Sequence, residues 1–329
     1  MISIERKIME TKRIFTNKVS AGLIASFCAI LWGSAFPALK ISYEAMNILP
    51  EATFDKIYFA GIRFFIASLL LFILSKILLN ESLLIKKKNI KFILGLGLLQ
   101  TAIMYFFFYN GLSYTSGIKS SILISSNNFF VVILAHFIYH DDRINSNKIL
   151  GLTTGFLGIV LVNLGSLPLD LTFTFKGEGF LILSALSGAF GNILAKKLTK
   201  DIHPFKITAW QMLFGSSTLL VIGKIGMKGS HLSFNPLSIG LLIYTSFLSA
   251  IAFALWFMLL KYNKAGEITL YRFLIPISGS ILSIIFLPEE HFSLNILLGL
   301  ILVSGGIILI NKKQKNMTDP KINQKTGNE

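Results

Sequence analysis

Long apolar stretches alternate with short polar ones along the whole chain. Each apolar stretch runs for about 18–24 residues, the length an α-helix needs to cross the hydrocarbon core of a bilayer. The polar punctuation between them predicts ten spans, at 21–41, 57–79, 91–113, 117–139, 149–165, 178–198, 205–226, 237–260, 267–287 and 294–311. We therefore expect an all-α integral membrane protein with ten transmembrane helices.

The second half of the sequence repeats the first. A shift of 148 positions places 105–163 over 253–311 without a gap, and it sets Arg63 opposite Gln211. For the first span a shift of 154 sets "GSAF" (33–36) against "SGAF" (187–190). This predicts two five-helix units, at 21–165 and 178–311, joined by a linker at 166–177. Because five is odd, the second unit must enter the membrane in the opposite orientation, which gives an inverted repeat.

The basic residues test that arrangement. If the N-terminus is cytoplasmic, 23 of the 31 Lys and Arg residues fall on the inner side, 6 on the outer side, and Arg63 and Arg272 within spans. Cytoplasmic loops carry such an excess of positive charge. We therefore expect a plasma-membrane protein with a cytoplasmic N-terminal segment at 1–20 and a cytoplasmic, disordered tail at 312–329. No cleaved signal peptide is expected, since no short apolar region precedes Ala21.

Composition supports a membrane protein and excludes several other classes. Hydrophobic residues make up 53% of the chain and charged residues only 14%, against about 25% charged in soluble domains. The net charge of +15 could suggest a nucleic-acid partner, but the basic residues border apolar helices, so we expect the bilayer as partner and no nucleic acid. The single cysteine, Cys28, excludes an internal disulfide or a multi-cysteine metal site and is expected to pack as a small hydrophobe.

Motifs for nucleotide hydrolysis, zinc proteolysis and serine hydrolysis are missing from the sequence. We therefore expect no enzyme activity and no cofactor. An inverted repeat favours a secondary transporter that exposes a midplane site to either side in turn, with a small molecule as substrate. Simple duplication of a helical bundle, a passive pore, and a membrane enzyme or lipid-handling flippase remain alternatives, the last because of the aromatic run "YFFFYNG" (105–111).

Polar and aromatic residues recur at helical spacing within several spans, which indicates a polar face turned toward other helices or a wet cavity. The predicted substrate-binding residues are Trp32, Ser34, Thr101, Tyr105, Tyr109, Ser125, Asn128, Asn192, Trp256 and Arg272. For any single Ser or Thr the alternative is a hydrogen bond to its own i−4 carbonyl. Asn127 and Asn128 are adjacent amides, and both could face lipid only at a large cost in free energy.

The two arginines within spans lie about 8–9 Å from the predicted helix ends at 1.5 Å rise per residue. Both could therefore extend to the membrane interface, and for Arg63 this structural role is the favoured interpretation. Arg272 shares a face with Thr269 one turn before Pro276, so a role at an anionic substrate group or at the inner gate is equally open. A coupling ion or proton is a further candidate partner, since transport could be driven by an ion gradient or by the substrate's own gradient.

The stretch "LWGSAFPALKIS" (31–42) predicts a bent first helix. Pro37 removes a backbone donor near Gly33, whose small size permits close helix approach. The second unit has Gly191 at the position equivalent to Pro37. The predicted hinges are Gly33, Pro37, Gly191 and Pro276, and the bends are expected to turn Trp32, Ser34 and Asn192 toward the cavity.

Taken together, "LWGSAF", the Arg-led second span "RFFIASLLLF", the acidic residues that close the fourth and ninth spans (Asp141 and Glu289) and the doubled five-helix layout resemble the drug/metabolite transporter (DMT) superfamily, EamA type. The resemblance covers about 21–311. It implies a secondary carrier, often an exporter of amino acids or other metabolites, with a cavity lined by spans 1, 3, 4, 6, 8 and 9. "YHDDR" (139–143) departs from the family pattern, so Asp141 and Asp142 are read as solvated cap residues. The resemblance leaves the oligomeric state open.

Overall fold

The computed structural model describes residues 10–49, 51–79, 83–114, 117–163, 173–228, 231–287 and 294–313. All regular secondary structure in these ranges is helical. Most of the predicted linker and all but two residues of the predicted tail, 164–172 and 314–329, lie outside the described residues.

The first half of the chain forms a short helical stretch at 10–16 followed by the helices of five predicted spans. They are α2 (Lys18–Ala45), α3 (Thr53–Leu79), α4 (Lys87–Gly97) continued by the π-helical η1 (Leu98–Ile103) and α5 (Met104–Leu112), α6 (Gly117–Ile138) and α7 (Ser146–Asn163).

The second half follows the same order. Its elements are the π-helical η3 (Phe175–Gly179) continued by α8 (Phe180–Leu198), α9 (Pro204–Gly226), α10 (Pro236–Tyr262), α11 (Ala265–Ile268) with the 3₁₀ stretch η4 (Thr269–Phe273) and α12 (Leu274–Phe286), and α13 (Leu294–Lys313). No helical segment ends more than four residues from the range predicted for it. Seven of the described segments are long and apolar enough to cross a membrane, and three shorter apolar helices accompany them.

Local sequence signals fix where several helices begin. The Asn17 side chain caps α2 by accepting from the backbone N–H groups of Val19 and Ser20 at 3.0 and 3.1 Å. Asn235 and Ser238 form a reciprocal capping box at the start of α10. Such caps satisfy N–H groups that the first helical turn leaves without partners.

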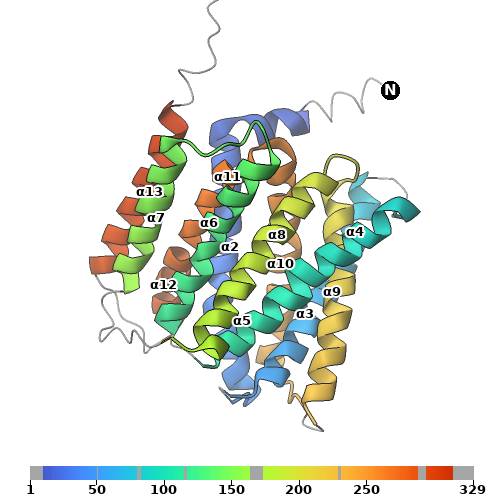
Figure 1. The fold of residues 1–329 in the computed structure, drawn as a ribbon. Helices are drawn as coiled ribbons and strands as arrows, with labels where there is room; N and C mark the ends of the chain where they lie inside the picture. The colour runs from blue at the N-terminus through green and yellow to red at the C-terminus, as the bar shows by residue number, and fades with distance from the viewer. Residues whose placement is uncertain are drawn as a thin grey trace, which may run out of the picture.

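Glycines allow helices from the two halves to pack closely. In Figure 1, α7 and α13 lie side by side at one edge of the bundle, while α3 and α9 lie toward the other. A methyl group at Gly223 of α9 would lie 2.7 Å from the Tyr58 backbone of α3, and one at Gly158 of α7 would lie 2.9 Å from the Gly299 carbonyl oxygen of α13. Small residues at such contacts let backbones approach and are typical of membrane helices.

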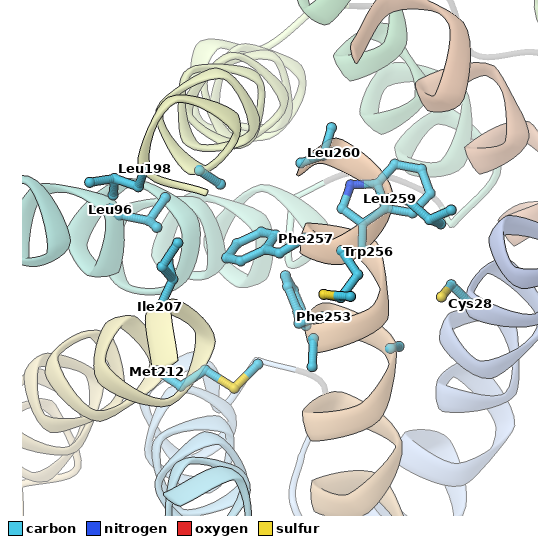
Figure 2. Packing of buried hydrophobic residues seen from close by; sticks show 14 of the residues in the cluster. Cys28, Leu96, Leu198, Ile207, Met212, Phe253, Trp256, Phe257, Leu259 and Leu260 are labelled. Carbon is cyan, nitrogen blue, oxygen red and sulfur yellow. The ribbon is translucent and has the colours of Figure 1, made fainter. Parts of the chain in front are cut away.

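The hydrophobic core centres on α10. Figure 2 shows its aromatic side chains Phe253, Trp256 and Phe257 between Ile207 and Met212 of α9 on one side and Cys28 of α2 on the other. Cys28 is fully buried, as expected for a small hydrophobe. The start of α2 and the end of α13 lie at the same end of the bundle (Figure 1).

The predicted hinges show mixed local geometry. Pro37 is buried within α2, which continues as one helical segment through it. Irregular helical geometry lies instead in η1, η3 and η4. The η4 stretch ends three residues before Pro276 of α12, which has no N–H to donate to the Arg272 carbonyl four residues earlier. Bending at Pro37 and Gly191 stays a prediction.

Candidate functional site

A guanidinium group stacked against two tryptophans lies inside the bundle. The Arg272 Nη1 donates a hydrogen bond to Asn127 Oδ1 at 2.9 Å. Its Cζ lies 5.4 Å from the Trp32 ring centroid and 5.7 Å from the Trp256 ring centroid. Contacts of this kind between a cation and an aromatic face are attractive, most strongly for tryptophan. The four residues come from α2, α6, α10 and η4, so both halves contribute.

Trp256 extends this cluster to a second amide. Its side chain is 1% exposed, and its indole Nε1 donates to Asn192 Oδ1 of α8 at 3.2 Å. The Trp32 and Trp256 rings meet edge to face with centroids 5.3 Å apart. We call Trp32, Asn127, Asn192, Trp256 and Arg272 the central cluster.

A second buried guanidinium lies on α3. Arg63 is only 4% exposed, with its Cζ 4.3 Å from the Phe64 ring centroid and 5.9 Å from that of Tyr105. The predicted extension of Arg63 to the membrane interface is therefore wrong. The reason is that α3 begins at Thr53, four residues before the predicted end, which puts Arg63 about 15 Å along the helix at 1.5 Å per residue.

Several buried polar atoms around these groups have no hydrogen-bond partner among the described residues. They are Trp32 Nε1, Arg63 Nε and Nη1, Gln100 Oε1, Asn192 Nδ2 and Gln211 Nε2, together with the hydroxyls of Tyr43 and Ser75. An unsatisfied buried donor or acceptor costs about 1–3 kcal/mol. So many in one bundle indicate a place where water or a ligand supplies the missing partners.

The structure places most of the predicted site residues in the central cluster, in one aromatic group and in two hydrogen-bonded pairs. Trp32, Asn192, Trp256 and Arg272 belong to the central cluster. Tyr105 and Tyr109 pack with Arg63 and Phe64, the Tyr105 ring centroid lying 4.7 Å from that of Phe64. Thr101 donates to Gln211 Oε1 at 2.9 Å, and Asn128 Oδ1 accepts from Thr269 at 3.4 Å.

Two predicted residues are placed differently. The Ser34 hydroxyl lies 2.6 Å from the Tyr244 hydroxyl, and that tyrosine is 42% exposed, so Ser34 does not join the central cluster. Ser125 is buried within α6. Ser249, also considered for the polar face of its span, donates to the Thr245 carbonyl of its own helix at 2.7 Å.

Sequence reasoning missed four members of the site. Asn127 was noticed only as a neighbour of Asn128, yet it accepts from Arg272 and donates to the Ala185 carbonyl at 2.6 Å. Arg63 was assigned to the interface. Gln100 and Gln211 are each buried to 1% exposure or less. The same feature of the sequence could have indicated all four residues. Each is a polar amide or guanidinium side chain inside an apolar span.

One end of the bundle is tied together by a buried ion pair. Asp142 and Lys148 are each 1% exposed, and Lys148 Nζ lies 2.5 Å from Asp142 Oδ1. The other carboxylate oxygen accepts from the Gly266 backbone N–H at 2.9 Å, at the start of α11. We call these three residues the Asp142 clamp. Asp142 is therefore not a solvated cap residue, a correction to the prediction, whereas Asp141 is exposed.

Further links between helices lie at this same end. The Tyr139 hydroxyl donates to the Ile193 carbonyl at 3.1 Å. Burial, with the negative charges of Asp142 and Asp141, raises the pKa of Tyr139 to about 12, so it stays a neutral donor. Lys196 donates to the carbonyls of Leu260 and Asn263. The first and second halves are thus joined around the α10–α11 turn.

A pocket with a volume of about 190 Å³ opens beside that turn. Its lining includes both charged and aromatic side chains, among them Lys18, Tyr262, Lys264, Glu267 and Tyr271. The pocket is distinct from the central cluster, and it lies where the start of α2 meets the turn between α10 and α11.

The fold and the buried cationic and aromatic centre define a multi-pass helical membrane protein. The profile of the EamA-like transporter family matches the chain twice, at residues 19–164 and 175–312. The chain therefore belongs to the EamA-like transporter family, within the drug/metabolite transporter type that the sequence resembled.

Individual relatives carry transporter names. The uncharacterized transporter YoaV of Bacillus subtilis is 26% identical over 89% of this chain and 96% of its own length. YvbV, another uncharacterized transporter of that organism, is 28% identical over 91% of this chain and 93% of its own length. A WAT1-related chloroplastic protein of Arabidopsis thaliana is 28% identical over 64% of this chain and 52% of its own length. These names point to a transporter rather than an enzyme.

The fold also has a counterpart of known structure. A solved crystal structure superimposes with a TM-score of 0.72 over 91% of this chain and 99% of that chain. The two sequences are 15% identical, so this similarity concerns the fold alone.

Proposed function

We propose that the protein is a secondary-active carrier that moves a small polar or amphipathic metabolite across the plasma membrane by alternating access. The observation that carries the proposal is the central cluster. Its residues come from α2 and α6 of the first half and from α8, α10 and η4 of the second. A site shared between two halves opens to either side when those halves rock against each other.

Helix packing supports an inverted repeat of two five-helix units. The α3 helix packs along α9, and α7 packs along α13, so in both cases a span meets its own equivalent from the other half. The α2 helix packs on α10 and α12, while its equivalent α8 packs on α5 and α6. Such reciprocal contacts are expected of two units related by a two-fold axis. The two matches to one family profile support the same interpretation.

The contacts at one end support an alternating mechanism. The Asp142 clamp and the Tyr139 hydrogen bond join elements of both halves there. In the proposed orientation this is the cytoplasmic end, because the start of α2 and the end of α13 lie at it and the basic loops flank it. Breaking these links would open the central cluster toward the cytoplasm.

Counterflow in proteoliposomes tests the proposal. Ligands are first selected from a broad metabolite panel by thermal stabilisation of the purified protein, since a ligand specific for the native state stabilises it. If the protein is a carrier, proteoliposomes preloaded with unlabelled ligand take up the labelled ligand faster than empty ones. The flux also saturates with ligand concentration. Asn192→Ala should reduce this exchange, whereas Gly240→Ala, at an exposed helical position with no neighbouring atoms, should not. Linear flux with a bilayer conductance would overturn the proposal in favour of a pore.

A further inference from the structure

The buried charge of the bundle is unbalanced. The buried charged residues of the described chain are Arg63, Asp142, Lys148 and Glu178. Asp142 and Lys148 neutralise each other, and Glu178 accepts from the Thr174 backbone and hydroxyl where η3 begins. Arg63 and the partly buried Arg272 have no ion-pair partner among the described residues. A buried charge without a counter-charge is costly.

Most of the unsatisfied atoms are hydrogen-bond donors. Of the eight buried side-chain atoms without a partner in the described residues, five are N–H donors: Trp32 Nε1, Arg63 Nε, Arg63 Nη1, Asn192 Nδ2 and Gln211 Nε2. The oxygens of the neighbouring amides are already occupied. Asn127 Oδ1 accepts from Arg272, Asn192 Oδ1 from Trp256 and Asn128 Oδ1 from Thr269. Gln100 Oε1 is an amide oxygen without a partner among the described residues, but the unsatisfied donors outnumber it.

We propose that the cargo is an organic anion with an apolar or aromatic body, and that Arg63 is a substrate-binding residue for its anionic group. The inference rests on the carrier function proposed above. An anion supplies the missing negative charge and acceptors for the unsatisfied N–H donors, and guanidinium groups bind carboxylates strongly. Phe64, Tyr105 and the two tryptophans supply contact surface for the apolar body. The ammonium of an amino acid or an amine would meet no carboxylate at the central cluster.

A matched series of probes separates charge from shape. We would use 3-phenylpropionate as the anion, 3-phenylpropionamide as the neutral form, phenylalanine as the zwitterion and 3-phenylpropylamine as the cation. A second series, from butyrate to butylamine, removes the aromatic ring. Binding is measured by thermal stabilisation of the full-length protein in detergent, and transport by counterflow. The anion of at least one series should bind 10-fold or more tightly than its neutral partner.

Arg63→Gln tests the assigned residue. The internal repeat places Gln211 opposite Arg63, and that glutamine is fully buried, so the bundle already accommodates this side chain at the equivalent position. The variant should bind the anion about 10- to 100-fold more weakly, the loss expected for a charge-assisted hydrogen bond. Binding of the neutral amide should not change. The matched control is Lys76→Gln, which removes an exposed positive charge from the same helix. Arg63→Lys keeps the positive charge but loses the planar guanidinium. Its anion affinity should therefore lie between those of the parent protein and Arg63→Gln.

The outcomes distinguish the two proposals. Tighter binding of the amine or the zwitterion than of the anion overturns the anion inference, and exchange of that ligand leaves the carrier function standing. Anion binding without accelerated exchange supports the anion site and counts against the carrier. If Arg63→Gln elutes as the parent protein and binds the anion as tightly, Arg63 does not bind the cargo. If that variant does not fold, equal anion affinity of the parent and Arg63→Lys overturns the assignment.

Discussion

Asp142 and Gly266 are 124 positions apart in the sequence, yet the Asp142 carboxylate accepts a hydrogen bond from the Gly266 backbone N–H at 2.9 Å. The contact joins the loop between α6 and α7 to the start of α11. Arg272 follows six residues later, in η4. The same carboxylate holds the buried ammonium of Lys148. The residue that supplies the central guanidinium therefore lies six residues from a buried contact between the two halves of the chain.

Asp142→Asn should destabilise the protein markedly. The change keeps an acceptor for Gly266 but leaves the Lys148 ammonium buried without a counter-charge. Removing one partner of a buried ion pair costs about 3–5 kcal/mol. Chemical unfolding of the purified protein in detergent measures this loss. Asp141→Asn is the control, since Asp141 is exposed and its loss should change stability little. Equal stability of the two variants would show that the buried pair contributes nothing.

The positions of the spans were predictable because they depend on length and hydrophobicity alone. A run of apolar residues must stay in the hydrocarbon region whatever it packs against, so the predicted ends fall within four residues of the observed ones. Helix caps outside that region shift the ends slightly. At α3 the shift of four residues moved Arg63 from the expected interface to the buried centre.

The contacts between spans were not predictable, since they depend on the rotation of each helix. Asn127 and Asn128 differ by about 100° around α6, and only the packed bundle decides that Asn127 faces Arg272 while Asn128 faces Thr269. The role of Asp142 depends on Gly266, in the other half of the chain. A single sequence contains no signal for such a pair.

Gly33→Ala should destabilise the contact between α2 and α12. A methyl group at Gly33 would lie 2.7 Å from the Gly279 backbone nitrogen and 3.0 Å from the Ile275 carbonyl oxygen. Because both are backbone atoms, the helices must separate, and overpacking of this kind costs about 1–3 kcal/mol. Thermal unfolding in detergent is the measurement. Gly240→Ala, where the added methyl meets nothing within 4 Å, serves as control. A parental unfolding temperature for Gly33→Ala would contradict the close packing.

Asn127 and Arg272 should show energetic coupling. The single variants Asn127→Leu and Arg272→Gln each remove their hydrogen bond of 2.9 Å. A double-mutant cycle on unfolding free energies isolates the interaction from the other effects of each change. We expect a coupling energy of about 1–2 kcal/mol, the range for hydrogen bonds between membrane helices in model peptides. Additive effects would mean that the two side chains act independently.

Labelling with a membrane-impermeant maleimide should show opposite sides for the two ends of α9. Lys200 and His231 are exposed residues in the connections that precede and follow this helix. Single cysteines at these positions are introduced into a Cys28→Ala background, which removes the one native thiol. In intact cells we expect labelling at 231 and none at 200, because the excess of basic residues places the connection at 200 in the cytoplasm.

Permeabilised cells provide the control for that experiment, since both positions should then react. Labelling at 200 but not at 231 in intact cells would reverse the proposed orientation, and the Asp142 clamp would then close the outer end. Labelling at both positions in intact cells would contradict a membrane crossing by α9. Because α9 is the second span of the second unit, the same result would also remove the inverted repeat on which the proposed rocking motion depends.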